Sequence, residues 1–271
     1  MVRLVSWNIG GPGAGWRDVV ALDADVALLQ EAPSPPADLR DRVFPDADEG
    51  DWLTAGPEVR RWRTAIVRLS DRVGLEPIIS GPLGTAWGSL GCSRAGSWCA
   101  ARLHGDDLPP ITVVSVYAAW ERSIDGNGPI WADASAHRIL SDLSPLLSAS
   151  GHRLLIAGDL NLLYGYGEHG NIAAKRRYQT VFDRAEALGL TYLGPRAPEG
   201  GRQPDPWPDE LPADSCTVPT YHTRTHGPAG ATRQLDHVFA SPSIAEATTV
   251  IACNEPEQWG PSDHCQILIE L

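Results

Sequence analysis

Residues 154–161 read LLIAGDLN, an apolar run that ends in Gly158, Asp159, Leu160 and Asn161. A short apolar run of this length predicts a buried β-strand. The acid and the amide that follow it do not suit the interior of a sheet. Open α/β sheets gather their ligands at the carboxyl ends of their strands. We therefore expect Asp159 and Asn161 to lie at a functional site beside the end of this strand.

Polar groups occupy the ends of other predicted strands on either side of this stretch. They are Asn8 at the end of the N-terminal strand, Gln30 and Glu31 after residues 26–29, Asp236 within the apolar run 235–239, and Asp263 and His264 before the strand 265–269. Because strand ends can meet at one edge of a sheet, we expect these side chains to converge.

Length and charge limit the classes of protein. The 271 residues contain no Ser/Gly linker or charge block, which favours one domain over residues 1–271. The 22 Lys and Arg against 34 Asp and Glu give a net charge of −12. A protein that binds through many phosphate contacts is normally basic. A polyanionic substrate therefore requires local positive charge or metal ions.

The cellular setting is predicted from what the chain lacks. The N-terminus begins in a strand and shows no signal-peptide pattern, and no apolar run approaches the roughly 20 residues of a membrane span. The five cysteines are an odd number without a Cys-x-x-Cys spacing. These features predict a cytoplasmic protein, although Cys92 and Cys99 could pair in an oxidising setting.

Helical and strand patterns alternate along the chain. Periodic apolar residues predict helices at 16–22, 130–148 and 178–188, and short apolar runs predict strands at 25–29, 64–69, 100–103 and 111–117. The segment 200–214 contains four prolines and is expected to be a loop.

Taken together, these motifs closely resemble the endonuclease/exonuclease/phosphatase superfamily, which includes deoxyribonuclease I, exonuclease III, abasic-site endonucleases, inositol polyphosphate 5-phosphatases and neutral sphingomyelinases. The ordered motifs are Asn8, Gln30-Glu31, Tyr117 after Ser-Val, Gly158-Asp159-Leu160-Asn161, Leu235-Asp236-His237 and Ser262-Asp263-His264. The resemblance implies an α/β fold: a four-layered sandwich of two mixed β-sheets with outer helices, called DNase I-like.

The residue types suit phosphodiester hydrolysis by in-line attack of water. Such a reaction needs a deprotonated nucleophile, neutralised phosphoryl oxygens and a stabilised leaving group. Hard oxygen donors favour Mg²⁺ or Mn²⁺. The resemblance implies that Glu31 is the principal metal ligand, with Asn8 beside it and Asp263 nearby.

The resemblance also implies roles for the remaining residues. Asp159 would orient or deprotonate the attacking water, and Asn161 would donate to a phosphoryl oxygen. His264 would contact the phosphate while Asp236 holds its tautomer. Tyr117 would touch the scissile phosphate or help the leaving group. Considered singly, these residue types are more often helix caps, turn residues or surface acids.

Several weaker candidates for substrate binding have structural alternatives. Thr220 lies upstream of Asp236, where the family often places a threonine near the phosphate, but a buried strand threonine is equally consistent. Trp120 and Trp259 could stack on a base or lipid, or simply pack. After Asn161, Lys175, Arg176 and Arg177 form a short basic cluster. Alternation along a strand places His237 on the face opposite Asp236, as a packed or surface histidine.

The favoured function is a nuclease-like phosphodiesterase acting on nucleic acid. Tyr117, where deoxyribonuclease I-like members carry a histidine, resembles the exonuclease III and abasic-site branch. The alternative is a phosphatase or diesterase of a small phosphorylated metabolite or lipid headgroup, which the acidic charge favours. A third reading is a non-catalytic binding module on the same fold, but the complete metal and base positions argue against it.

Overall fold

Two mixed β-sheets form the centre of the molecule in the computed structural model, which describes residues 1–10, 15–45, 52–56, 59–84, 89–105, 108–121, 132–147 and 151–271. Each sheet has six strands, and β6 and β7 form a small third sheet. The first sheet has the order β13-β14-β1-β2-β4-β3, and the second has the order β11-β12-β10-β9-β8-β5.

The strands have the following bounds. In the first sheet they are β1 Arg3–Asn8, β2 Val26–Ala32, β3 Val43–Phe44, β4 Arg63–Arg68, β13 Thr249–Ala252 and β14 Ile267–Glu270. In the second they are β5 Val73–Ile78, β8 Trp98–Gly105, β9 Leu108–Tyr117, β10 Leu154–Asp159, β11 Thr191–Gly194 and β12 Asp236–Ala240. The small pair is β6 Ser80–Pro82 and β7 Leu90–Cys92.

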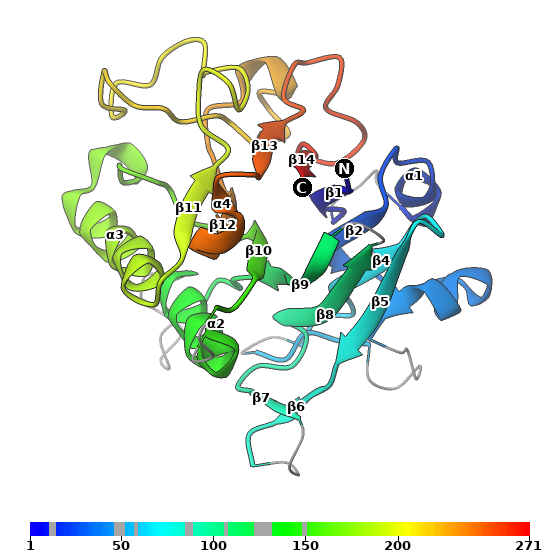
Figure 1. Cartoon of the computed structure of the whole chain (residues 1–271). Helices are drawn as coiled ribbons and strands as arrows, with labels where there is room; N and C mark the ends of the chain where they lie inside the picture. The colour runs from blue at the N-terminus through cyan, green and yellow to red at the C-terminus, as the bar shows by residue number, and fades with distance from the viewer. Residues whose placement is uncertain are drawn as a thin grey trace.

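Helices flank the two sheets. The α-helices are α1 Trp16–Val20, α2 Ala132–Leu147, α3 Ile172–Ala187 and α4 Pro242–Ala245, and the short 3₁₀ turns are η1 Ala37–Arg42, η2 Glu168–Gly170 and η3 Pro228–Gly230. Figure 1 shows α2 and α3 on one side of the sheets and α1 on the other. No helix in the described ranges is long and apolar enough to cross a membrane.

Alternating side chains on the strands separate the layers. In β10, Leu155 points between the sheets, where it packs with Leu28 of β2, whereas Ile156 points toward Ile139 of α2. In β2, Leu29 faces the outer side of the first sheet and packs in the cluster that includes Val19 of α1. This period of two, buried on both faces, produces the four-layered sandwich. The predicted fold class is confirmed.

Several element boundaries differ from the sequence prediction. Helix α3 begins six residues before the predicted start at 178, because the Asn171 side chain caps it by accepting hydrogen bonds from the amides of Ala173 and Ala174. Helix α1 ends at Val20, two residues early. The structure describes α2 over 132–147, so the predicted ends at 130 and 148 lie outside the described residues. Residues 200–214 contain no helix or strand, as expected.

Candidate active site

The strand registers bring the predicted polar residues to one edge of the sandwich. In the second sheet, β10 runs parallel to β9 and antiparallel to β12, so Asp159 pairs with Tyr117 on one side and with Asp236 on the other. In the first sheet β1 and β2 are also parallel, and Asn8 lies opposite Gln30. The Asn8 amide then crosses between the sheets and donates a 3.0 Å hydrogen bond to Asp159 Oδ2.

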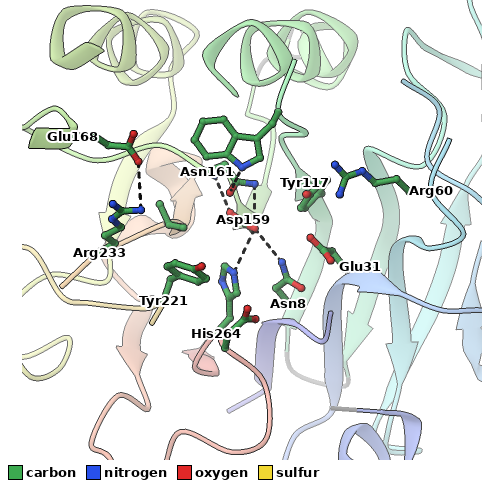
Figure 2. Close-up of a pocket in the computed structure, with 13 residues that line it drawn as sticks. Asn8, Glu31, Arg60, Tyr117, Asp159, Asn161, Glu168, Tyr221, Arg233 and His264 are labelled. Carbon is green, nitrogen blue, oxygen red and sulfur yellow. Dashed lines mark hydrogen bonds and ion pairs between the residues drawn. The ribbon is translucent and has the colours of Figure 1, made fainter. Parts of the chain in front are cut away.

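A pocket of about 320 Å³ lies over this junction. Its lining includes the predicted residues Asn8, Glu31, Tyr117, Trp120, Asp159, Asn161, Asp263 and His264. Figure 2 shows Asp159 at the centre of the group, with Glu31 and Tyr117 on one side and His264 below. Residues separated by more than 250 positions in the chain therefore share one cavity.

Glu31 is held in the pocket by local backbone geometry. Its φ is +51°, in the left-handed region that non-glycine residues rarely adopt. Gly10 supplies the space for the carboxylate, because a Cβ at that position would lie 2.2 Å from Glu31 Oε2. Strained backbone at a functional position persists only where the surrounding structure enforces it.

Asp159 is a buried carboxylate with several donors around it. Oδ1 accepts from the Asn161 amide at 2.8 Å, and Oδ2 accepts from the side chains of Asn8 at 3.0 Å and Asn161 at 3.3 Å. Burial and the negative charges of Asp236 and Glu31 outweigh the attraction of His264, and the pKa of Asp159 rises to about 7. The group can therefore exchange a proton near neutral pH.

The orientation of the Asn161 side chain is set by its neighbours. The Trp120 indole N–H donates to Asn161 Oδ1 at 2.9 Å, and an indole can only donate. Asn161 Nδ2 therefore points the other way and donates to Ala118 O at 3.2 Å and to Asp159. Asn161 itself has a φ of +52°. The aromatic residue considered for stacking thus has a specific polar contact with the site.

His264 lies between two carboxylates. Its Nδ1 donates to Asp236 Oδ2 at 2.8 Å, and its Nε2 is 3.8 Å from Asp159 Oδ2. Burial disfavours the imidazolium, but the charges of Asp236 and Asp159 dominate and raise the pKa of His264 to about 10. The ring is therefore a cation at neutral pH, and both nitrogens are donors. Asp236 supplies charge to this ring in addition to orienting it.

Tyr117 is buried between the pocket and Trp62. The two rings meet edge to face with centroids 4.7 Å apart. Burial, together with the charges of Glu31 and Asp159, raises the pKa of Tyr117 well above its usual value. Its hydroxyl therefore stays protonated and remains a hydrogen-bond donor.

Two groups of donor side chains, in the pocket and directly beneath it, could hold a metal ion. The first comprises Glu31, Asn8 and Asp263, which supply oxygens only. Asn8 Oδ1 accepts from the Gly10 amide at 2.9 Å and keeps its second lone pair. The second comprises Asp159, Asp236 and His264, whose ligand atoms all lie within 4.8 Å of one another.

Two of the weaker candidates differ from the expectation of substrate contact. Thr220 is fully buried, and its hydroxyl accepts from the amides of Leu235 and Asp236 at 3.0 and 3.1 Å. It therefore positions the start of β12 from beneath the site. Trp259 is also buried, with the His222 ring packed against its edge, so it has no surface for stacking on a substrate.

The predicted basic cluster also lies outside the pocket. Lys175, Arg176 and Arg177 are on the first turns of α3, and none of them lines the cavity. Arg177 pairs with Asp133 of α2 at 2.7 Å. His237 points away from the site, as alternation predicted: its Nε2 donates to Leu162 O at 2.9 Å, and its Nδ1 accepts from the Tyr192 hydroxyl at 3.1 Å.

The pocket also contains residues that the motifs did not reveal. They are Arg60, Glu168, Tyr221 and Arg233. Tyr221 packs against His264 with ring centroids 5.0 Å apart, and Arg233 forms an ion pair with Glu168 at 3.5 Å. Tyr221 directly follows Thr220, so alternation along that extended segment was the one signal available for it. Glu168 and Arg233 come from a turn and a loop without periodicity.

Comparison with known proteins gives a family match over most of the chain. The model of the Endonuclease/Exonuclease/phosphatase family matches residues 5–264. A search of curated proteins found no match.

Solved structures share the fold at low sequence identity. The Xenopus laevis APE2 catalytic domain has a TM-score of 0.62 at 17% identity, covering 99% of this chain and 91% of that one. The endonuclease domain of TRAS1, a telomere-specific non-LTR retrotransposon, has a TM-score of 0.59 at 16% identity and covers 100% and 98%. A Neisseria 3′ phosphatase, NExo, bound to a product DNA hairpin, has a TM-score of 0.57 at 16% identity and covers 100% and 99%.

Proposed function

Because this chain belongs to the endonuclease/exonuclease/phosphatase family, we propose that it is a divalent-metal-dependent phosphodiesterase of the nuclease type. It hydrolyses phosphodiester bonds by in-line attack of an activated water. The observation that carries the proposal is the environment of Asp159. Its carboxylate accepts hydrogen bonds from Asn8 of the first sheet and from Asn161 of its own loop, and its Oδ2 lies 3.8 Å from His264 Nε2.

Asp159 acts as the general base in this proposal. A base works best when its pKa is close to the working pH. Burial and two neighbouring acids raise the pKa of Asp159 to about 7, which meets that condition. The donors on its Oδ1 and Oδ2 fix the carboxylate plane, so a water hydrogen-bonded to it is held in one orientation.

His264 neutralises charge on the phosphoryl group. The 3.8 Å between its Nε2 and Asp159 Oδ2 is too long for a hydrogen bond. The Nε2–H is therefore available to a substrate oxygen, while Asp236 retains the Nδ1–H. A charged donor fixed in a buried site stabilises developing negative charge more strongly than water does.

Tyr117 and Asn161 complete the polar lining. The raised pKa of Tyr117 keeps its hydroxyl protonated, so it donates to the scissile phosphate or the leaving oxygen. Asn161 is held beside Asp159 by Trp120, which prevents the amide from rotating away. Both residues contribute fixed dipoles that need no reorganisation during the reaction.

The oxygen set of Glu31, Asn8 and Asp263 fits Mg²⁺ or Mn²⁺. The set of Asp159, Asp236 and His264 fits less well, because Asp236 Oδ2 and His264 Nδ1 are already joined to each other by a 2.8 Å hydrogen bond. A divalent cation held by Glu31 and its neighbours would neutralise charge on the phosphoryl oxygens. The space that Gly10 leaves for the Glu31 carboxylate supports this assignment.

The second candidate is hydrolysis of a small phosphorylated metabolite. The net charge of −12 and the position of the basic cluster on α3, outside the pocket, favour a short substrate over a long duplex. The nuclease reading is preferred because the pocket carries arginines on two walls, Arg60 and Arg233.

The proposal is tested with a magnesium-dependent panel of plasmid, abasic duplex, single-stranded DNA, RNA, nucleotides, inositol phosphates and sphingomyelin. We expect cleavage of a nucleic-acid phosphodiester that stops with a chelator and returns with Mg²⁺ or Mn²⁺. Release of phosphate from small molecules alone would support the second candidate. Inactivity across the whole panel would contradict both and support a binding module.

A further inference from the structure

The pocket has a cationic wall that the reaction above does not use. Arg233 lines the pocket on the side away from Glu31, with Asp159 and His264 between the two (Figure 2). The proposed metal ligands and His264 are sufficient for one phosphoryl group. The guanidinium of Arg233 lies in the same cavity on the far wall and has no part in those contacts.

Backbone pairing fixes where Arg233 lies. Tyr221 forms a β-bridge to Arg233 on one side and to His264 on the other, so the three residues form one row across adjacent extended segments. The carbonyl oxygen of Arg233 accepts from the amides of Thr220 and Tyr221 at 2.8 and 3.1 Å. Two strand spacings separate Arg233 from His264, which is roughly 10 Å between their backbones.

A turn beside Arg233, on the same side of the pocket, positions its partner (Figure 2). Glu168 begins η2, where His169 has a φ of +52° and Gly167 lies so close to Asn171 that a Cβ would come within 2.1 Å of its carbonyl oxygen. The Glu168 carboxylate meets one terminal nitrogen of Arg233 at 3.5 Å. This contact orients the guanidinium and leaves its other N–H groups to bind a ligand.

We propose that Arg233, oriented by Glu168, forms a second anion subsite that binds a phosphate next to the scissile one. The planar fork of an arginine suits two oxygens of a phosphate. Tyr221 separates this subsite from His264 and keeps the two anions apart. The second phosphate comes either from the neighbouring nucleotide of a chain or from a small bisphosphorylated molecule. This inference rests on the proposed phosphodiesterase function and adds a substrate requirement to it.

Two pairs of chromogenic phosphodiesters test the subsite and identify which kind of molecule supplies the second phosphate. The first pair is thymidine 5′-(p-nitrophenyl phosphate) with and without a 3′-phosphate. The second is the p-nitrophenyl phosphodiester of glycerol with and without a second phosphate. The readout is the ratio of kcat/KM within each pair, because general damage to the enzyme cancels in the ratio. We expect the second phosphate to raise kcat/KM roughly 10- to 100-fold in one pair, the effect of charge-assisted hydrogen bonds.

Substitutions connect that preference to Arg233. Arg233→Gln should reduce the ratio to near one, and Arg233→Lys should give an intermediate ratio because it keeps the charge and loses the fork. Arg102→Gln is the matched control, because Arg102 forms a similar 3.3 Å ion pair with Glu76 on β8 and β5 and does not line the pocket. Circular dichroism confirms that each variant is folded.

A preference for the second phosphate in the thymidine pair identifies a nucleotide substrate. The same preference in the glycerol pair identifies a small-molecule substrate, and either result supports the subsite. A ratio near one in both pairs, or a preference that survives in Arg233→Gln, overturns it. If none of the four esters is hydrolysed and the substrate panel described above is also inactive, the proposed function fails. Calorimetry with thymidine 3′,5′-bisphosphate then decides the subsite separately: binding lost in Arg233→Gln supports it, and no binding to the native chain overturns it.

Discussion

Asp236 influences the pocket through the charge that it places beside His264. Its Oδ2 accepts from His264 Nδ1, and its Oδ1 has no hydrogen-bond partner in the described part of the chain. Its negative charge stabilises the imidazolium directly and also raises the pKa of Asp159. The resemblance in the sequence predicted the pairing of Asp236 with His264. The role that it implied for Asp236 was to fix the tautomer of the ring. The pKa of about 10 at His264 depends on burial and on two acids distant in the sequence, which no local pattern reveals.

Asp236→Asn is expected to lower the pKa of His264 and thereby its charge. An asparagine oxygen can still accept from Nδ1, so the ring stays in place while the imidazolium loses stabilisation. We expect kcat to fall on the order of 10²- to 10⁴-fold, as for removal of a positioned electrostatic group. The alkaline fall in rate should begin at a lower pH than in the native enzyme. A pH–rate profile measures both effects.

His264→Ala serves as the companion variant. It should show a similar loss of turnover, while its thermal midpoint and its metal affinity change little. Glu31→Gln should instead weaken metal binding, as seen by calorimetry. Native turnover in His264→Ala would show that this histidine has no part in the chemistry.

His237 makes the stability of the protein depend on pH. Burial lowers its pKa to about 4, against about 6.5 in an unfolded chain. As pH falls below 6.5, the unfolded chain binds a proton at His237 before the folded chain does. The contribution of His237 to the free energy of unfolding is therefore most favourable above pH 6.5 and becomes progressively less favourable toward pH 4. Between pH 7.5 and pH 5 the loss is about 2 kcal/mol. Other buried groups also titrate in this range, so the test is the difference between two chains: on going from pH 7.5 to pH 5, the free energy of unfolding in urea should change less favourably in the native chain than in His237→Gln by about this amount. Equal changes in the two chains would contradict the prediction.

At the scale of elements, the sequence predicted which strands carry the site because each apolar run ends in a polar group. It could not predict the registers that pair Asp159 with both Tyr117 and Asp236, since those pairings join strands far apart in the chain. It also did not reveal Glu168 and Arg233, which come from irregular segments. The early start of α3 follows from the Asn171 cap, a local signal that the apolar period did not include.

Gly10→Ala tests whether Gly10, which follows β1, leaves the space that the carboxylate of Glu31 in β2 needs. The new methyl group would lie 2.2 Å from Glu31 Oε2, so the carboxylate must move. We expect Mg²⁺ affinity measured by calorimetry to fall roughly 10-fold or more, as when a group that orients a metal ligand is lost. Gly74→Ala on β5 is the control, because its nearest neighbour would be 3.8 Å away. Equal metal affinity in the two variants would show that Glu31 is not the ligand.

For the whole molecule, the net charge of −12 limits how a nucleic acid can bind. In the described part of the chain the pocket lining includes two arginines, Arg60 and Arg233, and the basic residues of α3 lie elsewhere. With about 0.7 to 0.9 log unit per phosphate contact, the slope of log affinity against log salt should be about −2 or shallower for a short oligonucleotide. Fluorescence anisotropy measures it. A slope twice as steep, reduced by Arg176→Gln, would instead indicate a binding track across α3.

The fold class was predictable as a whole because the ordered motifs span nearly the entire chain and resemble those of one family, and that resemblance implies the fold. The layers follow from alternation in strands buried on both faces, as in β10. The substrate is encoded less directly. It depends on which side chains from loops reach the pocket rim, and those positions are set by tertiary packing.

The most direct test of the account compares the native chain with Asp159→Asn in one assay of phosphodiester cleavage at saturating Mg²⁺, with metal binding followed by calorimetry. The variant should lose on the order of 10²- to 10⁴-fold in rate, the range for removal of a general base, and should still bind Mg²⁺. The native rate should vanish in excess EDTA and return with added metal. A native rate that persists in EDTA, or an Asp159→Asn variant as fast as the native chain, would contradict metal-dependent hydrolysis with Asp159 as the base.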